Sequence, residues 1–422
     1  MPRQRRLGRE EGARVPAIQR RLWVICWLQR RRSRAGGIEP PALPVRTDLP
    51  SRPILWGYLR VCLCFPLFYQ RFPLCLVLSQ STPHMNDERP KTRVGSRETP
   101  VLAHDYPFDP TYGYDLAELL NIEPPPEPAD FADTWRARYK AAVALDPQPE
   151  VGGSDHGHER LECRNIAYRS TDGFTIRGWL LIPRDRPPAR ALICGHGYGG
   201  MTGPDFPLPC ADALYLLPCF RGLCRSTRPP ISDNPWWHVL HDIDKPDRYI
   251  LRGCVEDLWA GVSAVLALYP WLAGAIGYLG MSFGGGIGAL ALPWEPRIAR
   301  GHLNVPTFGH HPLRLALPTT GCGESVRQFV QEHRHTAVTL SGYDAAIAAR
   351  HIKQPMHLAC ALFDPVVPPP GQFAIYNALA GDKRLHVLRA GHFDHPGRAA
   401  DEACLLEELA AFFHPLKAST AI

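Results

Sequence analysis

The stretch IGYLGMSFGGGIGALAL, residues 276–292, decides the fold. Its short apolar start predicts a strand up to Leu279, and residues 283–292 are typical of a helix. Ser282 therefore stands on a tight turn between a strand and a helix. This is the setting of a nucleophile elbow, in which a serine hydroxyl is exposed at the edge of a sheet.

The residues two positions before and two positions after Ser282 are both glycines. Side chains at Gly280 and Gly284 would collide with neighbouring backbone in so tight a turn, and glycine removes them. The start of the following helix also favours negative charge that develops near Ser282. The other interpretation is a glycine-rich turn without function, which a bare pattern of this kind allows.

Outward from this stretch, short apolar runs alternate with helical patterns across residues 190–413. Such alternation predicts an α/β fold with a mostly parallel central sheet that is covered by helices on both faces. The expected strands are 190–194, 214–219, 276–279, 300–305, 356–362 and 385–388, and the expected helices are 251–269, 283–292, 371–379 and 398–413.

Other segments flank or interrupt this alternation. A helix is expected over residues 130–145, and residues 161–168 and 174–183 predict an antiparallel hairpin at a sheet edge. Residues 306–352 are helical and polar, and we expect them to form a helical cap insertion over the C-terminal edge of the sheet. With this insertion, a single domain is expected over residues 103–416.

The first 84 residues differ in composition from the rest. They carry 15 arginines against four acidic residues, a balance of +11, and the remainder is therefore −5 because the whole chain is +6. We interpret residues 1–84 as a non-native or disordered extension, with Met85 as the natural start and residues 85–102 as a flexible lead-in. Residues 54–79 are apolar but interrupted by arginine and proline, so a membrane anchor there is the less favoured interpretation.

A serine hydroxyl is a weak nucleophile and needs a base that a carboxylate orients. On an α/β sheet with an elbow, the acid and then the histidine follow the serine along the chain. Asp364 and His392 each directly follow an apolar run, so both are expected on loops after strands. The alternative without function is a solvated loop acid and a histidine that only packs. Asp394 and His395 are rivals, but an aspartate so near its histidine in sequence is poorly placed to hold the ring.

An acyl-transfer site also needs hydrogen-bond donors for an oxyanion. We expect one donor to be the backbone N–H of Phe283, directly after the serine. The second is expected from the glycine-rich loop 195–200, where we choose the N–H of Tyr198. Phosphate binding is the alternative for this loop, but the sequence has neither the Lys-Ser/Thr of a P-loop nor the spacing of a dinucleotide fingerprint.

No cofactor and no metal are expected. The His156/His158 and His310/His311 pairs lack further ligands at convincing spacing, so we interpret them as surface or packing histidines. The mild negative charge of the bulk of the chain gives no argument for nucleic-acid binding. Thirteen scattered cysteines without any Cys-x-x-Cys favour reduced thiols, and hence a cytoplasmic location.

Taken together, these residues resemble the carbohydrate esterase family that contains the acetyl xylan esterases and cephalosporin C deacetylases, whose fold is the α/β-hydrolase fold. The resemblance extends from about Tyr114 to His395. The motifs that carry it are Asp130-Phe131 with Trp135, Gly197-Tyr198-Gly199-Gly200, Arg221-Gly222, Ser341-Gly342-Tyr343-Asp344-Ala345, Asp364-Pro365 with Tyr376-Asn377, and Gly391-His392.

The chain departs from the family pattern at polar positions beside these motifs. The family has Gln where Phe283 stands, Gln-Gly in place of Leu223-Cys224, and Glu in place of Phe393. The donor N–H at Phe283 survives, because every residue except proline supplies one. The chain therefore resembles a divergent branch of the family, with apolar residues near its site.

The resemblance implies a serine esterase that hydrolyses small acyl esters, acetyl esters above all, through an acyl-enzyme. Its catalytic residues would be Ser282, Asp364 and His392, and its substrates acetylated sugars or similar small molecules. It also implies a homo-oligomer. Alternatives are another activity on the same fold, such as a non-sugar esterase or a peptidase, and a catalytically silent binding protein, which the ordered triad residues disfavour.

Overall fold

A computed structural model describes residues 102–154 and 156–418. Its centre is a single sheet with the strand order β1-β2-β3-β5-β4-β6-β7-β8-β9. The strands are β1 (Glu150–Gly152), β2 (Leu161–Arg169), β3 (Thr175–Pro183), β4 (Arg190–Gly195), β5 (Ala213–Pro218), β6 (Ile276–Met281), β7 (Ile298–Asn304), β8 (Met356–Ala361) and β9 (Lys383–Leu388). All pairings from β5 through β4 to β9 are parallel, which confirms the expected mostly parallel sheet.

Helices surround this sheet. The helices are α1 (Leu116–Leu119), α2 (Phe131–Val143), α3 (Pro235–His238), α4 (Ile250–Leu268), α5 (Phe283–Ala291), α6 (His311–Ala316), α7 (Cys322–Glu332), α8 (Thr336–Ser341), α9 (Ala345–Ala349), α10 (Pro369–Ala378) and α11 (Arg398–Phe413). Short 3-10 turns are η3 (Thr171–Gly173), η4 (Cys224–Ser226), η5 (Pro270–Leu272) and η6 (Leu292–Trp294).

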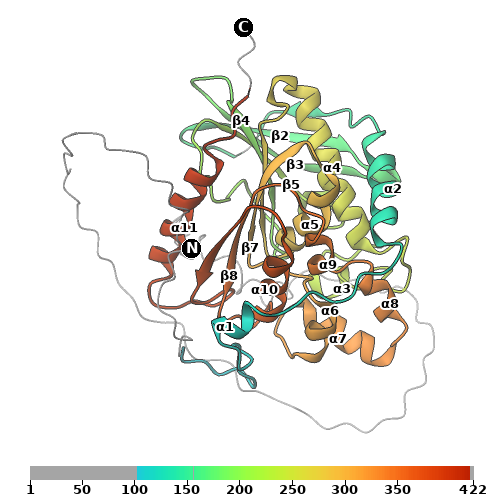
Figure 1. Cartoon of the computed structure of the whole chain (residues 1–422). Helices are drawn as coiled ribbons and strands as arrows, with labels where there is room; N and C mark the ends of the chain where they lie inside the picture. Colours follow the sequence, from blue (N-terminus) through green and yellow to red (C-terminus); the bar gives the residue numbers. More distant parts are fainter. Residues whose placement is uncertain (1–101, 155, 419–422) are drawn as a thin grey trace, which may run out of the picture. The chain divides into compact units, whose positions relative to one another are not determined.

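Alternate side chains of the central strands pack into different cores on the two faces of the sheet. In β4, Ala191 and Ile193 join the core beneath α4 and α5, whereas Leu192 and Cys194 join the core with α11. This alternation follows from the two-residue period of a strand. Figure 1 shows α11 apart from α4 and α5, which confirms that helices cover both faces.

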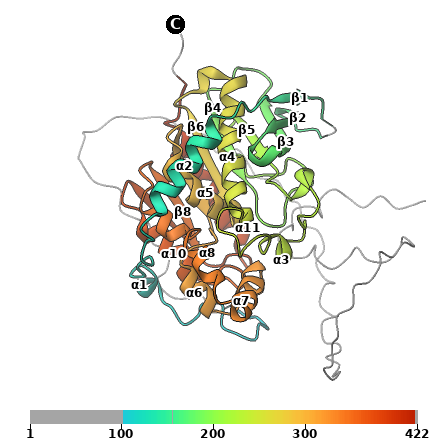
Figure 2. The same ribbon diagram turned by 90° about the vertical axis from the view of Figure 1, so that its right-hand side faces the viewer.

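The helix expected from the pattern at residues 130–145 is α2, and it forms an outer layer. It packs on α4, which itself contacts the sheet, and Trp135 meets Trp259 edge-on with 6.2 Å between ring centroids. The Trp135 indole N–H donates to the carbonyl of Gly342 at 3.1 Å. Figure 2 shows α2 crossing in front of α4.

The expected hairpin is formed by β2 and β3, which pair antiparallel from Leu161–Pro183 to Arg169–Thr175. The hairpin is not at the edge, because β1 pairs with the outer side of β2. The three residues of β1 are exposed and carry no apolar alternation, so the sequence offered little signal for this strand.

Between β7 and β8 the chain forms α6, α7, α8 and α9. The last of these packs against α5 and α10, within the helix layer of the domain. The other three lie at one end of the sheet together with α3, as both views show (Figures 1 and 2). The extent of the cap and the domain limits stay predictions, and residues 1–84 and most of the lead-in lie outside the described residues.

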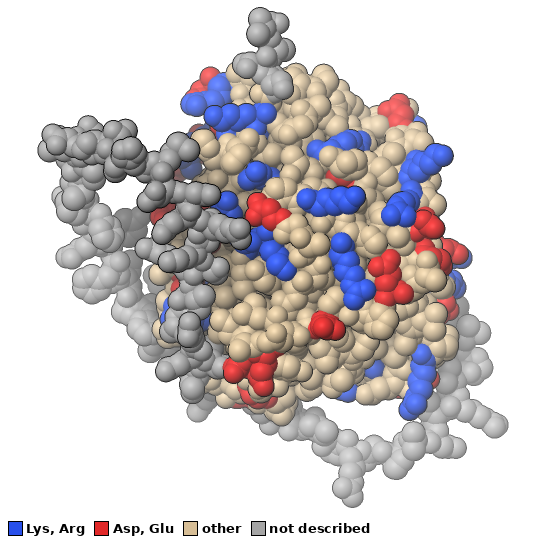
Figure 3. Space-filling model, in the orientation of Figure 1, with Lys and Arg blue, Asp and Glu red and all other residues tan. Residues whose placement is uncertain are grey.

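Two surface properties bear on partners. Among the residues described, no helix combines the length and apolar character needed to cross a bilayer, and the apolar stretch 54–79 lies outside them. On the face drawn in Figure 3, positive and negative side chains of the described residues are interspersed. This face therefore presents no large patch of a single sign.

Candidate active site

Ser282 stands between the end of β6 and the start of α5, as expected of an elbow. Its φ of +52° lies in the left-handed region, which a non-glycine residue adopts only where the surroundings hold it. A Cβ on Gly280 would lie 2.6 Å from the carbonyl oxygen of Gly284, and one on Gly284 would overlap the carbonyl oxygen of Gly195. The steric role expected of both glycines is therefore present.

A continuous series of hydrogen bonds joins Ser282, His392 and Asp364. The Ser282 hydroxyl donates to Nε2 of His392 at 2.9 Å. The other ring nitrogen, Nδ1, donates to Oδ2 of Asp364 at 2.8 Å. The Asp364 side chain is fully buried and the His392 side chain is 4% exposed, so water has little access to the hydrogen bond between them.

The Asp364 carboxylate is held by its own loop and by α10. The backbone N–H groups of Val366 and Val367 both donate to Oδ1 at 2.9 Å. The Gln372 side-chain amide donates to Oδ2 at 3.0 Å. With the ring of His392 added, the carboxylate has four donors and one defined orientation.

The rival residues lie elsewhere. His395 is hydrogen-bonded through Nδ1 to the carbonyl of Pro396, and its Nε2 lies 3.8 Å from Asp401. Asp394 lies 4.0 Å from Arg398 on the surface. Neither belongs to the series that reaches Ser282.

The segments that carry the two expected oxyanion donors adjoin the serine. A Cβ on Gly197 would be 3.8 Å from Cβ of Ser282, so the loop after β4 borders the nucleophile. Among the described residues, no backbone acceptor takes the N–H of Tyr198 or Phe283. The rings of these two residues stack at 4.0 Å between centroids, which fixes the loop against the start of α5.

His238 on α3 links Tyr198 to the loop after β5, a connection that sequence analysis missed. Its Nε2 donates to the carbonyl of Arg221 at 2.9 Å, and its Nδ1 accepts from the Tyr198 hydroxyl at 3.1 Å. Burial lowers the pKa of His238 to about 4, so the ring is neutral near pH 7 and can accept this bond. His238 lies 40 residues after Tyr198 in the sequence, and no local pattern links the two residues.

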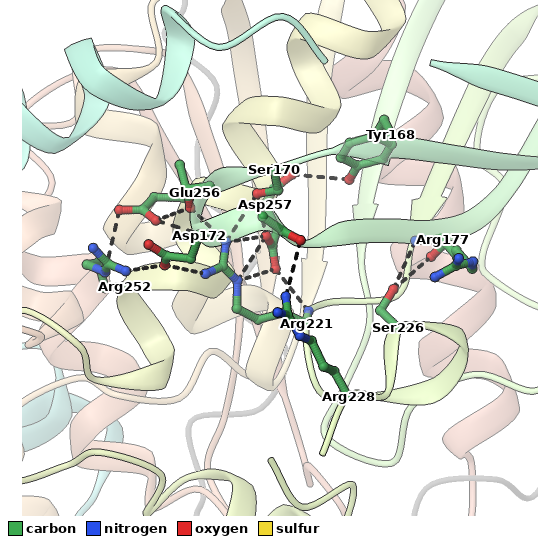
Figure 4. A network of polar contacts seen from close by, with 12 residues as sticks. Tyr168, Ser170, Asp172, Arg177, Arg221, Ser226, Arg228, Arg252, Glu256 and Asp257 are labelled. Atoms are coloured by element: carbon green, nitrogen blue, oxygen red, sulfur yellow. Dashed lines mark hydrogen bonds and ion pairs between the residues drawn. The ribbon is translucent and has the colours of Figure 1, made fainter. Parts of the chain in front are cut away.

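Arg221 is the buried centre of a network of polar contacts that supports this loop (Figure 4). Its guanidinium donates to Asp257 on α4, with a shortest contact of 2.7 Å, and to Asp172 at 3.1 Å. The backbone N–H of Arg221 also donates to Asp257, at 2.9 Å. The arginine that matches the family motif thus fixes the loop through charge-assisted hydrogen bonds.

Residues 104–112, here called the N-terminal strap, cover the loops that carry Asp364 and His392. Rings of the strap meet Phe363 and Phe393, with His104 5.4 Å from Phe363 and Tyr106 6.1 Å from Phe393. The carbonyl of Pro110 accepts from the N–H of Asp364 at 3.0 Å.

Contacts of this kind account for two of the departures from the family pattern. Phe393 packs 4.9 Å from Phe363 between the strap and the loop that carries the acid. Phe283 is fully buried and forms the stacking surface for Tyr198. Aromatic packing therefore holds the loops at both positions where the family has a polar side chain.

Residues of both histidine pairs considered as metal ligands make other contacts: Nδ1 of His158 accepts from the N–H of Leu161 at 3.2 Å. The His310 side chain caps α6 by accepting from the N–H of Leu313, and His311 is hydrogen-bonded to the carbonyl of Tyr343. Within residues 102–154 and 156–418, no group of three or more His, Cys, Asp or Glu side chains is arranged to hold a metal ion.

Comparison with known proteins assigns the chain to a family. The acetyl xylan esterase family profile matches residues 115–217 and 219–405. The chain belongs to the acetyl xylan esterase family. As a member of it, the chain is a carboxylic ester hydrolase, and the match covers Ser282, Asp364 and His392.

Solved structures agree on the α/β-hydrolase fold. Acetyl xylan esterase 1 from Thermoanaerobacterium sp. JW/SL YS485 is 22% identical with a TM-score of 0.60, and the alignment covers 72% of this chain and 99% of that one. The acetyl xylan esterase from Paenibacillus sp. R4 is 20% identical with a TM-score of 0.60, covering 71% and 99%. At these identities the likeness establishes the fold alone.

Proposed function

We propose that the chain is a serine esterase that removes acetyl groups from small molecules by way of an acyl-enzyme. The observation that carries the proposal is the hydrogen-bonded series from Ser282 through His392 to Asp364. A hydroxyl bonded to a neutral imidazole, whose other nitrogen donates to a buried carboxylate, is the arrangement that activates serine for attack on a carbonyl.

In the first half of the reaction, Ser282 Oγ attacks the acetyl carbonyl and its proton passes to Nε2 of His392. Asp364 stabilises the imidazolium and holds the ring in one tautomer. The N–H groups of Tyr198 and Phe283 bind the oxyanion of the tetrahedral intermediate. The intermediate collapses as His392 gives the proton to the leaving alcohol.

In the second half, water attacks the acetyl-enzyme and its proton passes to the same histidine. The second tetrahedral intermediate breaks to release acetate, and the proton returns to Ser282. Every proton transfer uses Nε2 of His392, so the two halves need no further acid or base.

Acetylated sugars, or molecules of similar size, are the proposed substrates. The nucleophile is 7% exposed and the strap covers the adjoining loops, which favours a small acyl group. Assembly into homo-oligomers stays a prediction of the family resemblance, and size-exclusion chromatography with light scattering tests it.

The experiment compares wild-type protein with Ser282→Ala on acetylated xylose, cephalosporin acetate, p-nitrophenyl acetate and aminoacyl amides. We expect acetate release from esters by the wild type, and residual turnover in the variant reduced by a factor of about 10³ or more. Equal turnover by both proteins would refute the assignment of Ser282. Preference for the amides would favour the peptidase alternative.

A further inference from the structure

A buried arginine without a carboxylate partner lies beside the proposed active site. Arg314 on α6 is 5% exposed, and its Nη1 has no hydrogen-bond partner within residues 102–154 and 156–418. The guanidinium lies over the ring of Phe308, 5.2 Å from the centroid. The other strongly buried arginines have acidic partners: Arg221 pairs with Asp257, and Arg190 with Asp212.

An unpaired buried cation is costly, because the lost hydration of the guanidinium is not replaced. Buried charges in proteins are as a rule paired, so an unpaired one that lines a cavity points to an anionic partner from outside the chain. The surroundings of Arg314 add to its positive field, since a Cβ on Gly323, in the first turn of α7, would lie 3.2 Å from Nη2. The start of a helix attracts anions.

The guanidinium lines a cavity. The cavity is small and partly open to solvent, and it lies between Arg314 and otherwise apolar or backbone surface. The other lining residues are Phe308, Gly309, Leu317, Val367, Pro368 and Gly371. The Thr319 hydroxyl lies near the same guanidinium, and it is also buried with no hydrogen-bond partner among the residues that the structure describes.

This cavity shares its walls with the proposed active site. Phe308 packs edge-on against Phe283, at 5.9 Å between centroids. Val367 donates its N–H to the Asp364 carboxylate. Burial raises the pKa of the Tyr198 hydroxyl and the charge of Arg314 acts in the opposite direction, so the guanidinium is within electrostatic range of the proposed oxyanion loop.

We propose that Arg314 and this cavity bind a carboxylate of the substrate, so that the preferred substrates are acetyl esters of acidic alcohols such as hydroxy acids or uronic acids. The inference rests on the proposed function and names its substrate class. The acetyl group is neutral, so the anion belongs to the alcohol part. A single guanidinium in an apolar cavity balances one charge, which favours a carboxylate over a phosphate dianion.

The test uses matched pairs of substrates that differ in charge. The wild type is assayed with 3- and 4-acetoxybenzoate and with the neutral 3- and 4-acetoxybenzamides. In a second assay, three compounds are tested as inhibitors of p-nitrophenyl acetate hydrolysis: the products 4-hydroxybenzoate and 4-hydroxybenzamide, and inorganic phosphate. We expect the carboxylate to improve KM or the inhibition constant about 10- to 100-fold over the amide, the range for hydrogen bonds to charged groups. Inorganic phosphate should inhibit no better than the amide.

Variants connect the preference to Arg314. In Arg314→Gln the preference for the carboxylate should vanish, while turnover of the amides stays near that of the wild type. The control is Arg334→Gln, which removes the same charge from an exposed position between α7 and α8 and should keep the preference. Because Arg314 has no acidic partner among the described residues, the urea midpoint of Arg314→Gln should equal or exceed that of the wild type.

The outcomes separate the inference from the proposed function. Hydrolysis of all four esters without a charge preference, or a preference that survives in Arg314→Gln, overturns the inference and leaves the esterase intact. Stronger inhibition by phosphate than by 4-hydroxybenzoate also overturns the assignment to a carboxylate. If no acetyl ester is hydrolysed the proposed function fails, and calorimetric binding of 4-hydroxybenzoate to wild type but not to Arg314→Gln still decides the inference. If Arg314→Gln does not fold, the comparison of inhibitors on the wild type decides it.

Discussion

Replacing Asp257 by asparagine should destabilise the protein strongly, although asparagine has nearly the same shape. The Asp257 carboxylate is fully buried and accepts from Nε and Nη2 of Arg221, from the N–H of the same residue and from the Ser170 hydroxyl. An amide group cannot accept all of these bonds, and its own N–H₂ would face other donors.

The magnitude follows from what Arg221 retains. Its side chain is 3% exposed, and its remaining acidic neighbours are Asp172, which is half exposed at 3.1 Å, and Glu256 at 4.0 Å. Breaking a buried ion pair by removing one partner costs about 3–5 kcal/mol. We expect a loss in this range, which is a large part of the total stability of an ordinary domain.

The assay is equilibrium unfolding in urea, followed by tryptophan fluorescence and by circular dichroism. The matched control is Asp172→Asn, which makes the same chemical change at an exposed member of the network and at a φ of +54° that asparagine also tolerates. It should cost about 1 kcal/mol or less. A loss below about 1 kcal/mol for Asp257→Asn, or equal losses for both variants, would contradict the assignment of the buried pair as the support of this loop.

Three other results are expected. Gly284→Ala should lower the stability by about 3 kcal/mol or more and abolish esterase activity, because its Cβ meets the backbone of Gly195. The control Gly153→Ala, with open space around it, should leave the urea midpoint and the activity unchanged. An active, stable Gly284→Ala protein would contradict this prediction. Tyr198→Phe should lose about 1–3 kcal/mol of stability, since Nδ1 of His238 loses its hydrogen-bond donor. Its kcat should stay within about threefold of the wild type, because the proposed oxyanion donor is the backbone N–H. A loss of kcat near that of a missing oxyanion donor would instead assign oxyanion binding to the hydroxyl. Burial lowers the pKa of both His238 and His311 to about 4 from 6.5, so between these pH values the unfolded chain binds protons that the folded chain does not. The urea midpoint should therefore fall as the pH falls from about 6.5 to about 4. Midpoints that are independent of pH in this window would show that the rings are not buried as neutral groups.

The sequence predicted the sheet and the positions of the proposed triad because those signals are local. The elbow needs two glycines at fixed spacing from Ser282, and the strands of a parallel sheet are short apolar runs. Asp364 and His392 follow such runs directly, and their order along the chain matched the fold. Their convergence needed only that parallel strands end at the same edge of the sheet.

Residues that act across the fold gave no such signal. Asp257 lies on α4 among apolar residues, and nothing in the pattern reveals that its carboxylate meets Arg221. His238 and Arg314 are single polar residues whose partner, or whose lack of one, depends on segments far away in sequence. Only packing in three dimensions decides whether such a charge is solvated, paired or left open.

The N-terminal strap has a consequence for how the protein is made. Residues 104–112 rest on Phe363 and Phe393, more than 250 positions later in the chain. During synthesis the strap leaves the ribosome early but has no surface to settle on until β8, β9 and the loop after β9 have emerged. The proposed active site is therefore one of the last parts to assemble, and a nascent chain that is still attached and lacks its final segment has not yet completed it.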